Sequence, residues 1–226
     1  MSTQPYRLLL EEATMPARRG EKLREHILWT AKDVFLEAGF ERTSMDVVAQ
    51  RAETSKRSLY AHFPSKDALF SGVVSLVREL YLDRLGSPED YVTAERADPA
   101  DALVRYCGRL LQLLLWSSSL RTLRMGIAEA ERVPEISSGY YEAVFEAPMA
   151  RIGAYACRAW NLTQQEAREV AEILVGRTVY PDLLQGLLGV REPIAERPDE
   201  ATLAADVDLD RIAASVRRIL PDAPAS

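Results

Sequence analysis

The sequence predicts an all-α protein with a small N-terminal head and a larger helical body. Apolar residues recur at three- and four-residue steps along most of the chain, which is the spacing of one helix face. No stretch alternates strictly enough between apolar and polar residues to indicate a sheet. With 47% hydrophobic residues among 226, the chain has enough apolar material for a core, which excludes a wholly disordered protein.

Composition also excludes membrane and secreted classes. Apolar runs are short, such as Leu113 to Trp116, whereas a bilayer span needs about 18 consecutive apolar residues. The apolar block near the N-terminus is followed at once by Glu11 and Glu12, unlike a secretion signal. The two cysteines, Cys107 and Cys157, cannot form a disulfide framework, and we expect small buried hydrophobes there. These features predict a soluble cytoplasmic protein.

Four helices are expected in the N-terminal part of the chain, the first three of which form the head, and each has a recognisable start or stop. The first carries an apolar face and ends at Gly39, which suits the left-handed residue after a helix. Thr43, with Asp46 three residues on, is expected to cap a second, short helix. Ser55 should cap the third, and Ser65 a fourth that runs to about residue 85.

The body begins after a polar stretch over 86–97. Asp98 and Pro99 are the expected cap and first residue of its first helix. Further helices are predicted around 119–132, over 135–160 with a kink at Pro148, and over 163–189 with a break at Pro181. A last amphipathic helix follows over 207–220. We therefore divide the chain into a disordered arm (1–19), a head (20–66), a body (67–220) and a disordered tail (221–226).

Charge is distributed unevenly between these parts. The net charge of −6 argues against a nucleic-acid partner when taken alone. Residues 21–70, however, hold eight basic and eight acidic residues, so the acidic excess lies in the body. A neutral head on an acidic body indicates two parts with different partners.

Residues 43–63 have the length and pattern of a helix-turn-helix, a motif that places its second helix in the major groove of DNA. Lys56 and Arg57 occupy the first turn of that second helix, where the helix dipole disfavours cations by a few tenths of a kcal/mol each. An external anion, such as a DNA phosphate or a base acceptor, would compensate both charges. A solvated basic face is the alternative interpretation.

The run from Ala31 to Phe70 resembles the TetR-family transcriptional regulators. It reads A-x-x-V-F-x-x-x-G-F, then T-S-x-x-x-V-A-x-R-A, then S-K-x-S-L-Y-x-H-F-P-S-K-x-A-L-F. The resemblance extends over about residues 21–85, while the body matches the family in size and helical character alone. It implies a homodimer that binds a palindromic operator as a repressor and is released by a small ligand. The positions that match the family's DNA-facing residues are Thr43, Lys56, Arg57, Ser58, Tyr60, His62 and Lys66.

The chain departs from the family pattern in the turn between the two short helices. The family usually has Gly and then Val there, whereas this chain has Glu53 and Thr54. Glutamate in a left-handed turn costs roughly 1 kcal/mol relative to glycine, and its carboxylate near DNA would repel phosphate. Either the turn has another geometry, or Glu53 points away and pairs with a nearby base.

Ligand and dimer contacts are expected in the body. Polar and aromatic residues on its helices are candidate ligand contacts, although aromatic residues at helical spacing are more often ordinary core. These candidates are Trp116, Arg124, Glu129, Tyr140, Tyr141, Phe145, Trp160 and Tyr180. The helices over 163–189 and 207–220 carry apolar stripes that we expect to pack against a twofold mate.

Three other interpretations remain open. A helical enzyme would use Glu129, Glu131 and Glu135 around a metal, but no Glu-x-x-His pair accompanies them, and we expect neither a metal nor a cofactor. A protein–protein interaction module would keep the head only as structure. Finally, Arg7, Arg18 and Arg19 could enter a minor groove as an N-terminal arm, with plain disorder as the alternative.

Overall fold

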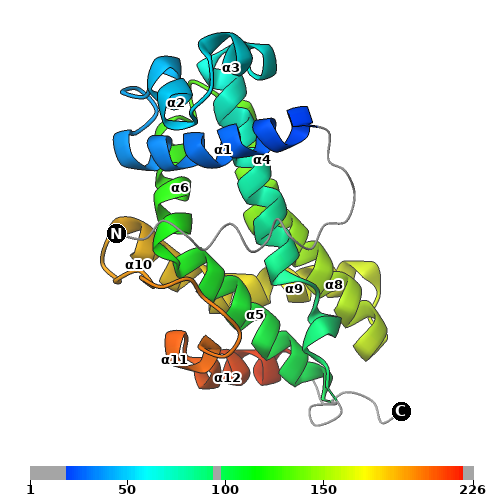
Figure 1. Cartoon of the computed structure of the whole chain (residues 1–226). Helices are drawn as coiled ribbons and strands as arrows, with labels where there is room; N and C mark the ends of the chain where they lie inside the picture. The colour runs from blue at the N-terminus through cyan, green and yellow to red at the C-terminus, as the bar shows by residue number, and fades with distance from the viewer. Residues whose placement is uncertain (1–18, 94–97, 221–226) are drawn as a thin grey trace.

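The computed structural model describes residues 19–93 and 98–220, and within these ranges the regular structure is helical (Figure 1). An isolated bridge joins Trp116 and Ile194, and no described segment forms a strand. The all-α prediction is therefore confirmed. The predicted arm and tail, including the minor-groove role of Arg7 and Arg18, fall outside the described residues apart from Arg19, which begins the first helix.

The four helices expected in the N-terminal part of the chain are present as α1 (Arg19–Ala38), α2 (Met45–Arg51), α3 (Lys56–His62) and α4 (Lys66–Leu85). Gly39 has φ +79° after α1, as its position predicted. Phe35, Phe40 and Phe70 pack together at the centre with ring centroids 4.9–5.7 Å apart. This aromatic cluster holds α1, the following turn and α4 as one unit.

Helix α4 joins the head to the body. Near its N-terminal end, Leu69, Phe70 and Val73 are buried in the head core, whereas Leu85 at its C-terminal end is buried in the body core. Figure 1 shows α4 running from the head down beside α5. The expected boundary between head and body at residue 66 stays a prediction. The packing shows that α4 contributes side chains to both cores.

The body is built around α5 (Pro99–Leu115), which is buried along most of its length and contacts α4 as well as most other elements of the body. Asp98 caps α5 through the N–H of Ala100, and Pro99 begins it, as predicted. The remaining body elements are η2 (Pro88–Tyr91), α6 (Ser117–Ala128), α7 (Pro134–Tyr141), η3 (Glu142–Glu146), α8 (Ala147–Trp160), α9 (Gln164–Thr178), α10 (Tyr180–Leu188), α11 (Leu203–Asp206) and α12 (Leu209–Ile219).

The structure differs from the sequence prediction at the start of α2 and within the segment 135–160. Ser44, not Thr43, caps α2, and its hydroxyl accepts from the N–H of Val47. The kinked helix expected over 135–160 is instead α7, a π-helical turn and α8. In that turn the N–H of Ala147 reaches Glu142, five residues back. Pro148 has no N–H to donate, and the π-helical turn just before it keeps the chain helical up to α8.

The segment predicted as a broken helix over 163–189 is confirmed in its main features. Thr163 and Glu166 form the predicted capping box, with both reciprocal bonds present. The chain then divides into α9 and α10 next to Pro181, and Gly189 ends α10 with φ +75°. The predicted loop over 190–205 contains α11, which sequence patterning did not indicate.

Helix α12 corrects a second expectation, because its apolar stripe is covered within the same chain. Ile212 and Val216 are fully buried against α5 and α9. Asp182 of α10, itself buried, pairs with Arg211 of α12 and lies 3.0 Å from Arg191. The apolar stripe of α12 therefore needs no partner subunit to cover it.

Within residues 19–93 and 98–220, no helix has both the length and the apolar character that crossing a bilayer requires.

Candidate nucleic-acid interface and internal cavity

Helices α2 and α3 are held as a rigid pair by a tight turn. The N–H of Glu53 donates to Gln50, and that of Thr54 donates to Ala49, at 3.2 and 3.0 Å. Val48 of α2 and Leu59 of α3 are completely buried between the two helices and α1. Ser55 caps α3 as predicted, accepting from the N–H of Ser58. The polar face of α3 is thus presented on a fixed support.

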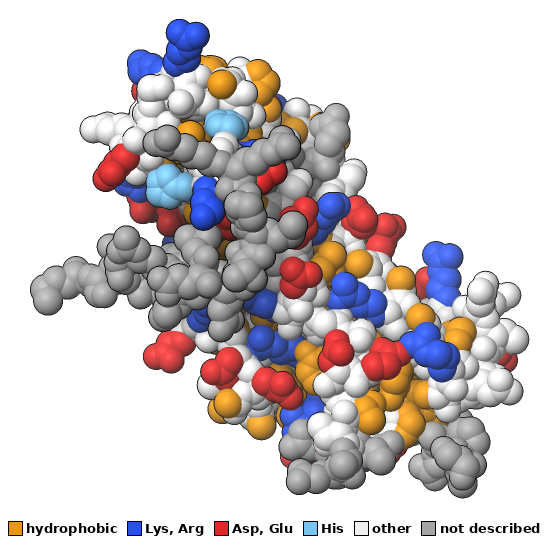
Figure 2. All heavy atoms as spheres, turned by 45° about the vertical axis from the view of Figure 1, so that its right-hand side comes forward, with side chains coloured by type: hydrophobic (Ala, Val, Ile, Leu, Met, Phe, Trp, Pro, Cys, Tyr) orange, Lys and Arg blue, Asp and Glu red, His pale blue; other side chains and the backbone are white. Residues whose placement is uncertain are grey.

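The first turn of α3 carries its two exposed basic side chains. Figure 2 shows basic side chains at the end of the molecule formed by α2 and α3. The Lys56 ammonium lies 2.7 Å from the Asp46 carboxylate of α2, so its charge is compensated within the chain. No described ion pair involves Arg57, which therefore presents an uncompensated guanidinium to solvent.

The other predicted contacts on α3 differ in how far they reach. Tyr60 is exposed, whereas Ser58 and His62 are half-buried. The His62 ring lies 6.4 Å from the ring of Phe63 at the end of the helix. Arg57 and Tyr60 therefore present the most accessible polar groups of the set.

Thr43 and Lys66, for which the family resemblance predicts DNA contacts, are both hydrogen-bonded within the head. Thr43 is buried, its hydroxyl donates to Gly39 and its N–H to Phe40, so it has no donor left for a phosphate. The Lys66 ammonium donates to the carbonyls of Phe40 and Glu41 and lies 4.2 Å from the Phe40 ring. Thr43 stabilises the turn between α1 and α2 from within it, and Lys66 does so from the start of α4.

Glu53 adopts the left-handed conformation that glycine would favour, with φ +49°. The turn therefore keeps the family geometry, and the first of the two alternatives, another turn geometry, is wrong. The side chain of Glu53 is exposed, and none of the ion pairs found in the described part of the chain includes it. The basic side chain that the second alternative gives Glu53 as a partner is therefore not found among the described ion pairs.

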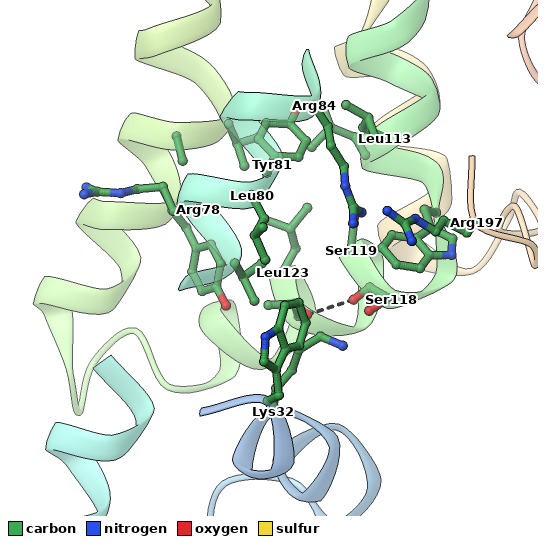
Figure 3. A pocket seen from close by; sticks show the side chains of 18 residues that line it. Lys32, Arg78, Leu80, Tyr81, Arg84, Leu113, Ser118, Ser119, Leu123 and Arg197 are labelled. Carbon is green, nitrogen blue, oxygen red and sulfur yellow. Dashed lines mark hydrogen bonds between the residues drawn. The ribbon is translucent and has the colours of Figure 1, made fainter. Parts of the chain in front are cut away.

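An internal cavity of about 310 Å³ lies where head and body meet. Its walls come from α1, α4, α5, α6, the α7–η3 segment and the loop after α10 (Figure 3). Apolar side chains form most of the lining, including Val77, Leu80, Leu113, Leu114, Leu123, Ala143 and Val144. The aromatic and polar lining residues are Trp29, Lys32, Arg78, Tyr81, Arg84, Trp116, Ser118, Ser119, Thr122, Tyr140 and Arg197.

Two lining tyrosines carry hydroxyl groups without a hydrogen-bond partner. The Tyr81 and Tyr140 hydroxyls are buried and unsatisfied. Burial raises the pKa of both phenols, so both stay protonated at neutral pH and can each donate one hydrogen bond. A buried polar group without a partner costs free energy, and in both tyrosines the hydroxyl oxygen itself is closed off from the cavity.

Of the ligand contacts predicted from sequence, the structure brings two, Trp116 and Tyr140, to the cavity. Arg124 instead donates to the carbonyls of Gly186 and Leu187 at the end of α10. Glu129 pairs with Arg132 at 2.7 Å, and the Trp160 ring packs 6.2 Å from Tyr155. The remaining three candidates form a row of aromatic rings with centroids 5.1–5.4 Å apart outside the cavity: Tyr141, Phe145 and Tyr180.

Sequence reasoning missed the cavity residues that come from other segments, chiefly Trp29 and Lys32 of α1 and Arg197 of the loop after α10. Lys32 could have been noticed, because it follows Ala31 on a helix face that is otherwise apolar. Nothing in the sequence indicates that this face meets α4 and α6.

The other candidate chemistry is accounted for by packing. Cys107 is fully buried, and burial raises the pKa of its thiol to about 12, while Cys157 is half-buried. Across the described residues, no group of three His, Cys, Asp or Glu side chains is placed to hold a metal ion.

Comparison with known families agrees with this arrangement. The family model for bacterial regulatory proteins of the tetR family matches residues 27–73, which covers α2, α3 and parts of α1 and α4. A second model, the C-terminal domain of AefR-like transcriptional repressors, matches residues 101–162. The chain belongs to the TetR family of transcriptional regulators. Members of this family bind DNA and are not enzymes.

Solved TetR-family structures share the fold across nearly the whole chain. A TetR-family transcriptional regulator from Mesorhizobium loti, described as putative, is 23% identical with a TM-score of 0.70, covering 90% of this chain and 97% of that one. The flavonoid-responsive regulator FrrA is 24% identical with a TM-score of 0.64, covering 88% and 95%. These likenesses show the fold of this TetR-family chain.

Curated relatives match a shorter region of the TetR-family chain. The nucleoid occlusion factor SlmA of Shewanella sp. (strain W3-18-1) is 33% identical over 92 residues, which is 41% of this chain and 43% of SlmA. SlmA of Shewanella loihica matches to the same extent. The chain thus spans less than half the length of these curated relatives.

Proposed function

We propose that this TetR-family regulator is a cytoplasmic homodimeric repressor that binds a palindromic operator and is released by a small effector. The observation that carries the proposal is the exposed first turn of α3, where Arg57 has no acidic partner in the described part of the chain. In a helix-turn-helix, the N-terminal residues of the second helix contact base edges. Arg57 is therefore assigned the bidentate contact to guanine, which arginine makes best.

The remaining DNA contacts follow from exposure and partners. Lys56 exchanges its contact with Asp46 for a phosphate, and Tyr60 donates to a phosphate oxygen. Ser58 and His62 contribute from half-buried positions. We assign Thr43 no direct contact, because its donors already bond the backbone of the α1–α2 turn. Lys66 uses two of its three N–H donors on the same turn, which leaves one for a phosphate.

The dimer interface is assigned to α9 and α10. Tyr180, Leu184 and Leu188 repeat every four residues along α10, and Leu184 and Leu188 are 57% and 70% exposed. Ile173 of α9 is also exposed, and Tyr180 continues into the aromatic row with Phe145 and Tyr141. A twofold mate would bury these apolar side chains in a four-helix contact. The expected share of 207–220 is withdrawn, because α12 packs inside its own subunit.

Effector release is assigned to the cavity at the head–body junction. A ligand there touches α1 and α4 directly, so it acts on the head without a long chain of intermediates. It favours a second dimer geometry in which the two heads no longer match half-sites about 34–36 Å apart. The similarity in fold to FrrA, a flavonoid-responsive regulator, is consistent with a small-molecule effector.

Fluorescence anisotropy with labelled DNA from the region upstream of the gene tests DNA binding. We expect Arg57→Ala to weaken specific binding by about 1–3 kcal/mol, and Lys56→Ala to weaken binding to all sequences and lower the salt slope by about one. Arg168→Ala, which removes an exposed cation of α9 far from the head, is the matched control and should change neither.

The same titration separates the alternative, a protein–protein module that keeps its head only as structure. That alternative predicts no DNA affinity even at low salt, and equal behaviour of Arg57→Ala and the wild type. Such a result would refute the regulator.

A further inference from the structure

The cavity at the head–body junction carries charge of one sign. We propose that its ligand is a small organic anion with a flat, apolar body, whose carboxylate is held between Lys32 of α1 and Arg197 of the loop after α10. This inference rests on the proposed effector-responsive function and specifies the chemistry of the effector.

The first step is the balance of charge in the lining. Four basic residues line the cavity, and no aspartate or glutamate does. Arg78 is set aside, because its guanidinium lies 3.0 Å from Glu142 and points away from the cavity in Figure 3. Lys32 and Arg197 carry the argument, and with no acidic side chain in the lining the cavity has a positive potential that an anion would neutralise.

Lys32 is the decisive residue because it is a buried cation. It is 9% exposed, and its nearest described carboxylate, Asp33, lies 3.5 Å away with an exposed side chain. The ring of Trp29 lies 5.6 Å from the ammonium and provides a further weak interaction. Burying an ammonium is costly unless it is paired and hydrogen-bonded, and an exposed neighbour on the same helix pairs with it only in part. A carboxylate inside the cavity would complete the pairing.

Arg197 supplies the second positive charge from the loop after α10. The segment that carries it is anchored where α5 meets α6, since Ile194 donates to Leu115 and accepts from Ser117, both at 2.9 Å. Figure 3 shows the Arg197 side chain on the same side of the cavity as Ser118 and Ser119. Its exposed guanidinium takes part in no described ion pair, so it is available to a ligand that enters there.

The rest of the cavity specifies the body of the ligand. The leucine and valine side chains of α4, α5 and α6 leave it apolar, and the rings of Trp29 and Trp116 favour a flat aromatic body. A volume of about 310 Å³ lies at the small end of known ligand sites and admits a single small molecule.

Such a ligand would join the head to the body directly. Lys32 belongs to α1 in the head, whereas Arg197 belongs to the body, so one carboxylate held by both fixes α1 against the loop after α10. A neutral analogue of the same shape would fill the apolar space without forming this link. The charge of the effector, not its bulk alone, then sets the position of the head.

Binding to the purified full-length protein, without DNA, tests the proposal. The probes are 4-hydroxycinnamate and 4-hydroxybenzoate, each with its neutral methyl ester, and binding is followed by calorimetry and by quenching of tryptophan fluorescence. We expect at least one acid to bind and its ester to bind about tenfold more weakly, because a charge-assisted hydrogen bond is lost.

Two variants and a control assign the effect. Lys32→Met keeps most of the side-chain volume, and Arg197→Gln changes an exposed residue, so each should weaken the acid about tenfold and leave the ester unchanged. Arg158→Gln removes an exposed arginine of α8 that does not line the cavity and should change neither.

The proposal is overturned if no acid of the set binds at millimolar concentration, if acid and ester bind equally, or if both variants keep the wild-type preference for the acid. DNA binding by the ligand-free protein, measured in parallel, reports on the regulator itself. Loss of DNA binding there would refute the proposed function, whereas DNA binding with no preference for the acid would refute only the anionic ligand.

Discussion

At the scale of the residue, Glu53 shows how a local cost is retained in a site that otherwise follows its family. The turn between α2 and α3 requires a left-handed residue, and Glu53 adopts φ +49° although its Cβ makes that conformation unfavourable. Glycine, which has no Cβ, would adopt it freely. The position of Glu53 beside the DNA-facing helix adds a negative charge where phosphates are expected.

We predict that Glu53→Gly raises the free energy of unfolding by about 1 kcal/mol, measured by urea denaturation. It should also strengthen DNA binding, because one repulsive charge is removed. Glu53→Gln separates the two effects, since it removes the charge and keeps the strain. Asn161, with φ +53°, is the matched control, and Asn161→Gly should gain less because asparagine tolerates this conformation. A loss of stability in Glu53→Gly would contradict the account.

At the scale of the element, caps and breaks were predictable from sequence, and contacts between elements were not. Ser55 and the Thr163–Glu166 box are local patterns, and the structure has them as predicted. The capping role of Thr43 was wrong by one residue, because the hydroxyls of Thr43 and Ser44 are equivalent in sequence and only packing against Gly39 distinguishes them.

The same difference separates the candidate DNA-binding residues, which form a local pattern, from the cavity, which does not. The candidate DNA-facing residues of α3 lie within one short motif, so sequence alone could propose them, whereas the internal bonds of Thr43 and Lys66 became visible only in the structure. The cavity unites α1 with α4, α5, α6 and the loop after α10, and no local pattern reports that proximity. The coverage of α12 by α5 and α9 was missed for the same reason.

The turn between α6 and α7, residues 129–133 and called the corner below, links the body to the head through Arg132. Its guanidinium lies 3.7 Å from the centre of the Phe40 ring and 2.5 Å from Asp67 at the start of α4. It also lies 2.7 Å from Glu129 in its own corner. Arg121 of α6 adds a bond to the carbonyl of Leu36 at the end of α1.

We predict that Arg132→Ala lowers the free energy of unfolding by about 1–2 kcal/mol, since it removes a cation–π contact and partly exposed ion pairs. Urea denaturation measures this. Arg168→Ala, which breaks an exposed pair with Glu172, should cost less than about 0.5 kcal/mol. Equal stability of Arg132→Ala and the wild type would show that the corner does not hold the head.

At the scale of the whole molecule, charge and apolar surface are divided between functions. The acidic excess lies in the body, while residues 21–70 are neutral and include the exposed cations Lys56 and Arg57 of α3. The exposed leucines of α10 lie on the body, on an element separate from the DNA-facing helix. This separation lets one surface join subunits while the other contacts DNA.

We predict that Leu184→Glu with Leu188→Glu converts the dimer to a folded monomer in sedimentation velocity. Both side chains are exposed in the single chain, so the change should leave the helical content unaltered. Val92→Glu, at an exposed apolar residue after η2, is the control and should remain dimeric. A double variant that still sediments as a dimer would place the interface elsewhere.

The central claim is that two copies of α3, related by a twofold axis, read DNA sequence. Selection of bound duplexes from a random pool by the purified wild-type protein tests it most directly. We expect the enriched sequences to share an inverted repeat, and Arg57→Ala to relax the preference at one position in each half. A pool that stays random, or that yields a single unrepeated half-site, would contradict the claim.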